Sequence, residues 1–149
     1  MENQGEEIPL IHLMPLMQRV MSLAELHKKF GITKSQLVIY LVLYYMGSAT
    51  MTEIAQYISS SKEQATRAVS ALCDNGTVER YENRDNRTHV HLRLSDAGLA
   101  YIQNIISELR SEVNNRLSSG LSTEDIEKLK ESVRTTVEIL GKLNFTKCT

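Results

Sequence analysis

Proline, cysteine and long apolar runs are scarce in this sequence of 149 residues. The two prolines, Pro9 and Pro15, both lie near the start. No apolar run approaches the roughly 18 residues of a membrane-spanning helix, and the acidic opening MENQGEEIPL is the reverse of a signal peptide's basic start. We therefore expect a cytoplasmic protein with no membrane partner, folded as a single domain over residues 1–149.

The two cysteines and four histidines do not have the spacing of a metal site. Cys73 is expected on the buried face of a helix as a small hydrophobic residue, and Cys148 in the tail as an incidental exposed thiol. His89 and His91 fall on one face of a predicted strand. Two histidines there could ligate a metal, but such pairs are more often exposed to solvent or to DNA phosphate. We predict no metal and no cofactor.

Motifs of catalysis are also missing. The sequence has no Gly-rich phosphate loop, no nucleophile elbow and no paired carboxylates in an apolar context, so an enzyme is not expected. An excess of basic residues is missing too, because the net charge is −1. Nucleic-acid binding usually comes with a basic balance. Any such function must therefore depend on where the basic residues lie.

Apolar residues three and four positions apart dominate the chain, and this spacing predicts a mostly helical protein. The first helix is predicted from about Pro15 to Phe30, with the proline at the first helical position. An apolar arm at 8–13 precedes it and needs a surface to lie on. Thr33 is the expected N-cap of a central, buried helix at 34–46, whose apolar residues run nearly all round.

Residues 52–72 meet the steric demands of a helix-turn-helix. Thr52 is the expected N-cap of a short helix at 53–58, and a serine turn leads to a second helix at 62–74. Ala55 is small enough for the two helix backbones to approach each other. Apolar residues spaced to face a shared core occur in both helices: Ile54, Ile58, Ala65, Val69 and Leu72. Any packed helical hairpin has similar needs, so this signal alone is only moderately specific.

The second predicted helix carries DNA-binding chemistry at its N-terminal end, the end that a recognition helix inserts into the major groove. Gln64 can read adenine edges, and Thr66 can touch thymine methyl groups or phosphate. Lys62 and Arg67 suit phosphates or guanine, and Ser61 precedes them at the start of the helix. A solvated polar face on a surface helix would have the same composition.

After the helix-turn-helix the apolar period changes to two, which predicts a β-hairpin with its strands and loop at 78–82, 89–94 and 83–87. In the loop, Arg84 and Arg87 flank Asp85. An acid between two arginines commonly fixes one guanidinium by a forked ion pair, which suits a hairpin tip that lies in the minor groove. An isolated hairpin of this kind is a charged turn, but directly after the helix pair it predicts a wing.

Two amphipathic helices are predicted at the C-terminal end. Ser95 is the expected cap of a helix to about Leu117, Gly120 breaks it, and Ser122 opens a capping box for the last helix. Their apolar stripes are long for a small domain, and together with the N-terminal arm they predict a homodimer. The segments expected in the dimer contact are 8–30 and 95–145.

The stretch 33–99 resembles the MarR family of bacterial transcription regulators. The motifs that carry the resemblance are 33–36 (TKSQ), 51–55 (MTEIA), 62–67 (KEQATR), Leu72 with 75–76 (NG), 78–80 (VER), 85–87 (DNR) and 92–98 (LRLSDAG). Arg84 replaces a proline frequent before the wing tip, and Thr88 replaces a second arginine. Four arginines between residues 77 and 94 meet three acids, a local balance of only +1. DNA affinity is therefore expected to be modest and strongly salt-dependent.

The resemblance implies a winged helix-turn-helix at 33–94 in a mostly α-helical fold with a small β-hairpin wing, flanked by dimerisation helices. It implies a homodimer that reads half-sites about 10 bp apart in a pseudo-palindromic operator. It also implies a repressor relieved by a small phenolic or lipophilic effector. Tyr40, Tyr44 and Tyr45 could border the effector pocket, although core packing explains them equally well. The alternative is a winged helix that serves as a protein-interaction module and does not bind DNA.

Overall fold

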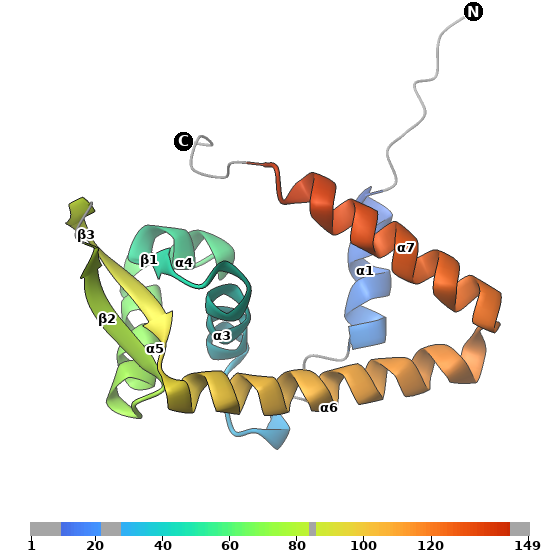
Figure 1. The fold of residues 1–149 in the computed structure, drawn as a ribbon, viewed down its shortest axis with the longest axis horizontal. Coiled ribbons are helices and arrows are strands. Elements are labelled where there is room, and N and C mark those ends of the chain that lie inside the picture. The colour runs from blue at the N-terminus through green and yellow to red at the C-terminus, as the bar shows by residue number, and fades with distance from the viewer. Residues whose placement is uncertain (1–9, 22–27, 84–85, 144–149) are drawn as a thin grey trace, which may run out of the picture.

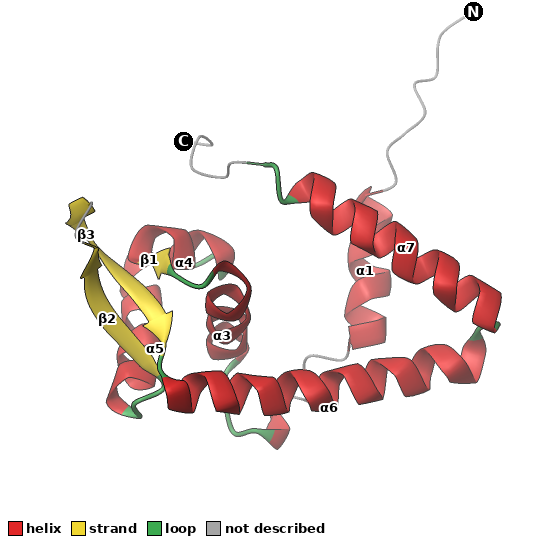
Figure 2. Cartoon of the chain, viewed as in Figure 1, coloured by secondary structure: helices red, strands yellow, loops and turns green. Residues whose placement is uncertain are grey.

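The computed structural model describes residues 10–21, 28–83 and 86–143, and of residues 10, 21, 83 and 86–89 the backbone alone. Helices dominate, and one small sheet lies near one end (Figure 2). The elements follow in this order: α1 (Leu10–Met21), α3 (Lys34–Met46), β1 (Ala49–Thr50), α4 (Met51–Tyr57), α5 (Lys62–Asp74), β2 (Val78–Asn83), β3 (Asn86–Leu94), α6 (Asp96–Gly120) and α7 (Thr123–Leu140). The expected mostly helical fold with a β-hairpin is confirmed. None of the helices within these residues is both long and apolar enough to cross a membrane.

Side-chain caps begin the helices that the sequence marks most clearly. At α3, Thr33 Oγ1 accepts the N–H of Gln36 at 3.1 Å, and Gln36 Oε1 accepts the N–H of Thr33 at 2.9 Å. Ser95 and Ser122 cap α6 and α7 as expected. The predicted bounds of α3 and α5 are confirmed, whereas α6 continues past Leu117 to Gly120.

The start of α1 differs from the prediction. The helix begins at Leu10, so Pro15 lies inside it and not at its first position. The expected apolar arm is thus helical from Leu10 onward, because its residues continue the helical spacing. Proline at this point removes the backbone bond that an N–H would make to the carbonyl of Ile11, and its ring crowds that carbonyl. The predicted continuation through 22–27 lies outside the described residues.

The start of α4 was also predicted wrongly, because Thr50 and not Thr52 is its cap. Thr50 Oγ1 accepts the N–H of Glu53 at 3.3 Å, and Glu53 Oε2 accepts the N–H of Thr50 at 2.7 Å. A capping box needs an acid or amide three residues after the cap. Thr52 has Ala55 at that distance, so the reciprocal bond is available to Thr50 alone.

The sheet is antiparallel with strand order β1-β3-β2. The two residues of β1, which the sequence did not predict, pair Ala49 with Leu92 and extend the hairpin toward α4. The hairpin strands are longer than expected, since Asn83 pairs with Asn86 after an irregularity in register. The predicted bounds of the loop, 83–87, are therefore wrong, because β2 extends to Asn83 and β3 begins at Asn86.

The core lies between α3, the helix-turn-helix, the sheet and the first turns of α6. As predicted, α3 is central, and five of its residues are buried: Leu37, Ile39, Tyr40, Val42 and Leu43. Each such side chain contributes roughly 1.5–3 kcal/mol by burial. Tyr101 of α6 donates its hydroxyl to the carbonyl of Phe30 at 3.1 Å. Burial, and secondarily the neighbouring Tyr40, raises the pKa of Tyr101, which keeps this donor protonated.

Away from this core, α1 and α7 expose apolar side chains. Figure 1 shows α6 running along one edge, from the sheet at one end of the molecule to α7 and α1 at the other. No residue of α7 is buried. Large apolar side chains that remain exposed on the two helices are Ile11, Leu13, Met14, Leu16, Met17, Leu129, Val133, Val137, Ile139 and Leu140.

Candidate nucleic-acid interface

The second helix of the helix-turn-helix, α5, has one buried and one exposed face. Ala65, Val69 and Leu72 are fully buried against the core, together with Ile54 of α4. These are residues that the sequence analysis assigned to the shared core, and the assignment is confirmed; Ile58 is half-buried. Because the core fixes this face, the opposite side of α5 must point into solvent.

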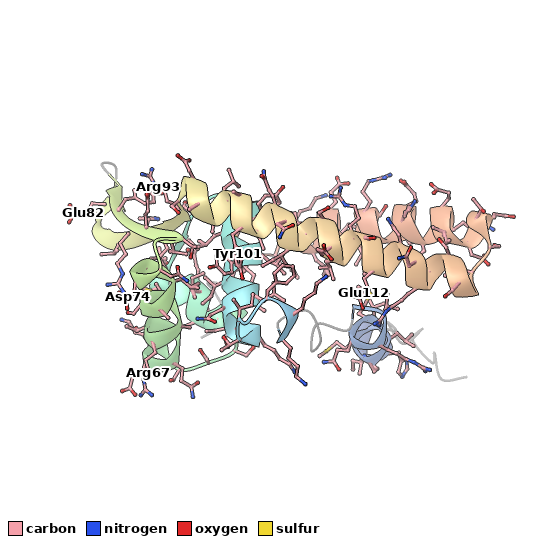
Figure 3. All side chains as sticks on the ribbon, turned by 90° about the horizontal axis from the view of Figure 1, so that it is seen from below. Arg67, Asp74, Glu82, Arg93, Tyr101 and Glu112 are labelled. Carbon is pink, nitrogen blue, oxygen red and sulfur yellow. The ribbon has the colours of Figure 1, made fainter. Side chains whose placement is uncertain are left out.

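The exposed face carries the predicted DNA-contact residues of this helix. Ser61, Lys62, Gln64, Thr66 and Arg67 are all exposed. Ser61 Oγ is occupied as the N-cap and accepts the N–H of Gln64 at 3.3 Å. Thr66 Oγ1 donates to the carbonyl of Lys62 at 2.7 Å, so its hydroxyl can act outward only as an acceptor. Figure 3 shows Arg67 at the end of α5 that lies farther from α6.

Sequence reasoning missed the acid on this surface. Lys62, Glu63, Thr66 and Arg67 line one open hollow. A carboxylate in the first turn of a helix is favoured by the positive N-terminal end of the helix dipole. It also lowers the positive charge that this surface presents to phosphate. The position of Glu63 could have been read from the sequence, because it adjoins Lys62.

The hairpin extends from the same end of the molecule as α5 (Figure 1). Pairing of Asn83 with Asn86 brings the two strands together at the tip. The predicted tip residues Arg84 and Asp85 lie outside the described residues, as does the side chain of Arg87. Their ion pair stays a prediction.

On one face of the hairpin, the positive charge of Arg93 is paired with a carboxylate of the neighbouring strand. Arg93 Nε lies 3.1 Å from Glu79 Oε2, and its guanidinium carbon is 4.9 Å from the centre of the Tyr81 ring. His91 follows on this face, with its ring 5.7 Å from that of Tyr81. His91 is half-buried, and its contact with DNA phosphate stays a prediction. The side chain of His89 is not among those described.

The opposite face of the hairpin carries Arg80. Its Nη2 donates to Ser70 Oγ of α5 at 3.2 Å. Arg80 thus bridges the wing and the second helix, whereas Arg93 lies on the side of the hairpin away from α5 (Figure 3). The two arginines are equivalent in the sequence, and only the register of the strands puts them on opposite faces.

The start of α6 is fixed to the turn between α5 and β2. Ser95 Oγ donates to the carbonyl of Gly76 at 2.6 Å, and the N–H of Ser95 donates to that of Thr77 at 3.0 Å. A Cβ on Gly98 would lie 1.9 Å from the carbonyl oxygen of Thr77. Only glycine lets α6 approach so closely. The position of the wing is therefore tied to that of the long helix.

The three tyrosines of α3 have different surroundings. Tyr40 is buried in the core, and its hydroxyl is 2.7 Å from Thr77 Oγ1. Tyr44 packs edge-on against Tyr45 at 5.2 Å between ring centres. Tyr45 is exposed and lines a shallow apolar hollow with Leu41, Val42, Met46 and Tyr57. Core packing thus explains Tyr40, whereas Tyr45 borders a hollow. No His, Cys, Asp and Glu side chains in the described ranges group as a metal site.

A two-helix unit with a free polar face, followed by a hairpin, is the arrangement of a winged helix-turn-helix. Residues 32–90 match the model of the MarR family. This stretch is a MarR family domain. The resemblance inferred from the sequence motifs is thereby confirmed. No curated protein sequence matches the chain.

Solved structures of MarR proteins share the whole fold. A cysteine-to-serine mutant of MarR from E. coli is 21% identical, with a TM-score of 0.72 over 89% of this chain and 99% of the other. The same mutant complexed with operator DNA is 21% identical, with a TM-score of 0.61 over 92% and 99%. NadR in complex with 4-hydroxyphenylacetate is 19% identical, with a TM-score of 0.68 over 97% and 100%. At these identities the likeness establishes the winged-helix fold.

Proposed function

We propose that this chain is a transcription regulator that binds double-stranded DNA sequence-specifically. The observation that carries the proposal is the free face of α5, where Lys62, Gln64 and Arg67 are exposed at the N-terminal half of the helix. Those side chains suit base edges and phosphates in a major groove. The hairpin beside it suits the neighbouring minor groove. The E. coli MarR mutant of the same fold is complexed with operator DNA.

The regulator acts as a homodimer. The apolar side chains exposed on α1 and α7 have no partner in the core of their own chain, and exposed apolar surface of this extent marks an interaction site. A two-fold dimer would present two copies of α5 to successive major grooves, about 34 Å apart. The operator is then a pseudo-palindrome with half-sites about 10 bp apart.

The regulator is a repressor that a small-molecule effector relieves. The shallow hollow lined by Leu41, Tyr45 and Tyr57 has mostly apolar walls, which a small aromatic compound could contact on one side. NadR, of the same fold, is in complex with 4-hydroxyphenylacetate. The cytoplasm is the compartment that this function requires.

The decisive experiment is selection of bound genomic fragments by the purified full chain, repeated across a salt series. It yields the operator, the half-site spacing and the number of phosphates neutralised. Failure to retain any fragment at about 0.1 M salt would favour the rival function, a winged helix that contacts another protein.

Within that experiment, Arg67→Ala and Arg87→Ala should each weaken operator binding about ten-fold or more, because each removes a charge-assisted contact. Fluorescence anisotropy with a labelled operator measures the change. Arg110→Ala is the matched control, since Arg110 is exposed in the C-terminal half of α6, and this helix leads away from α5 (Figure 1). Wild-type affinity in both test variants would contradict the proposed interface.

A further inference from the structure

Arg80 lies where the second helix of the helix-turn-helix meets the wing, and no carboxylate among the described side chains pairs with it there. Its guanidinium donates to the hydroxyl of Ser70, a neutral partner. We infer that Arg80 is a further DNA-contact residue, which binds the phosphate backbone between the major groove entered by α5 and the minor groove beside it. This inference rests on the proposed DNA-binding function and names an additional contact in that interface.

The strand register directs Arg80 toward α5. Arg80 pairs with Leu92, which is fully buried on the core side of the sheet. Directly paired residues share a face, so the Arg80 side chain leaves the sheet on the side of α5. Ser70 follows Arg67 by three residues, and positions three apart are neighbours on a helix surface. Arg80 therefore lies beside the C-terminal continuation of the DNA-contact face.

The electrostatic environment of Arg80 differs from that of Arg93. Arg93 has its carboxylate in Glu79 at 3.1 Å and its aromatic cover in Tyr81. Glu79, the residue before Arg80, is on the opposite face of the hairpin; the acids next along the face of Arg80 are Glu82, two residues along the strand, and Asp74, one turn beyond Ser70. Within the described part of the chain neither forms an ion pair with Arg80.

A guanidinium has five N–H donors, and the bond to Ser70 uses one of them. The remaining donors keep the geometry that suits a phosphate. Arg80 is exposed, so a ligand can reach it. The Ser70 bond holds the side chain in place and thereby lowers the entropy that binding would otherwise cost.

The geometry of a DNA duplex indicates that a backbone phosphate is the ligand of Arg80. A helix in the major groove and a hairpin tip in the adjacent minor groove must lie on either side of one sugar–phosphate backbone. That backbone passes under the junction of the two elements. Arg80 occupies the junction, because it joins β2 to α5 by the bond to Ser70. Contacts of this kind position a protein on DNA without reading its sequence.

The test compares Arg80→Gln with Arg93→Gln, two equal changes on opposite faces of one hairpin. Operator affinity is measured by anisotropy from about 50 to 300 mM salt, and thermal unfolding verifies that each variant folds. Arg80→Gln should weaken binding about ten-fold and reduce the slope of log K against log salt by about one per protomer. Arg93→Gln should change both by much less, and Arg80→Lys should keep the wild-type slope.

Two outcomes would overturn the inference while the proposed function stands. In one, wild-type protein binds the operator and Arg80→Gln keeps the wild-type slope. In the other, Arg93→Gln reduces the slope of log K against log salt as much as Arg80→Gln does, which would show that the effect comes from net charge. Wild-type protein that shows no salt-dependent binding to any duplex would refute the proposed function and the inference together.

Discussion

Gly98 shows how the absence of one Cβ lets α6 pack against the turn between α5 and β2. Its backbone approaches the carbonyl of Thr77 so closely that any side chain would collide with main-chain atoms. A main-chain carbonyl cannot rotate away as a flexible side chain could. The sequence motif at 92–98 pointed to the family but contained no physical sign of this contact. The approach depends on the angle at which α6 leaves the hairpin, which no local pattern encodes.

Gly98→Ala should therefore destabilise the fold by about 2 kcal/mol, within the range for inserting atoms into a packed site. Urea unfolding followed by circular dichroism measures the change. Gly120→Ala is the matched control, because a Cβ at Gly120 meets nothing within 4 Å and alanine favours a helix. Equal stability of the two variants would mean that α6 can shift away from Thr77 at little cost.

The candidate site was predictable residue by residue where its side chains lie on a helix. The exposed set on α5 follows from helical spacing once the buried face is known, so Lys62, Gln64 and Arg67 could be named in advance. The same reasoning could not separate Arg80 from Arg93, because strand register decides which face each one takes. Register depends on contacts between strands and not on either strand alone.

At the scale of elements, helices with a clear cap and a clear breaking residue were predicted correctly. Elements without such signals were missed or misplaced. The bounds of α3 and α5 were correct because each has a cap at one end and a breaking residue at the other. The strand β1 was missed because it has only two residues and no period can be read from so short a segment. The cap of α4 was misplaced because two threonines, Thr50 and Thr52, lie near the start of the helix, and only the acid at Glu53 discriminates between them.

Replacing Thr50 and Thr52 in turn tests which of the two caps α4. Thr50→Ala should lower the free energy of unfolding by about 1 kcal/mol, because it removes an N-cap. Thr52→Ala should change it by less than about 0.5 kcal/mol, since Thr52 is an exposed residue inside α4. Guanidinium unfolding of both variants measures the difference. A larger loss for Thr52→Ala would reverse the assignment of the cap.

At the scale of the whole molecule, the net charge of −1 is unfavourable for binding DNA, which is itself negatively charged. The distribution of charges over the structure explains part of this difference. Acids and bases pair along α6 and α7, as in Lys128 with Glu124 and Arg116 with Glu112. Pairs of this kind on the surface contribute little to stability. Acids on α6 and α7 are thus paired locally with bases, while Lys62, Arg67 and Arg80 are exposed on α5 and the wing.

The dimer proposal predicts that α7 cannot tolerate charge on its apolar stripe. Val137→Glu should convert the dimer into a monomer in sedimentation experiments and weaken operator binding by about a hundred-fold, because two linked half-site contacts become independent. Thr135→Glu is the control, since residue 135 lies nearly opposite residue 137 on the helix. A monomeric wild type, or a Val137→Glu variant that stays dimeric, would place the dimer contact elsewhere.

The length of α6 has a consequence for how such a regulator could be switched. Its 25 residues form one uninterrupted helix, a rod about 37 Å long at 1.5 Å per residue. One end is fastened to the wing by Ser95 and Gly98, and the other leads into α7. A tilt of only about five degrees at the α7 end moves the fastened end by about 3 Å, close to the rise of one base pair of duplex DNA. In the proposed dimer, a small repacking at the α7 end of the helix would therefore move the wing by about one base-pair step along a bound operator.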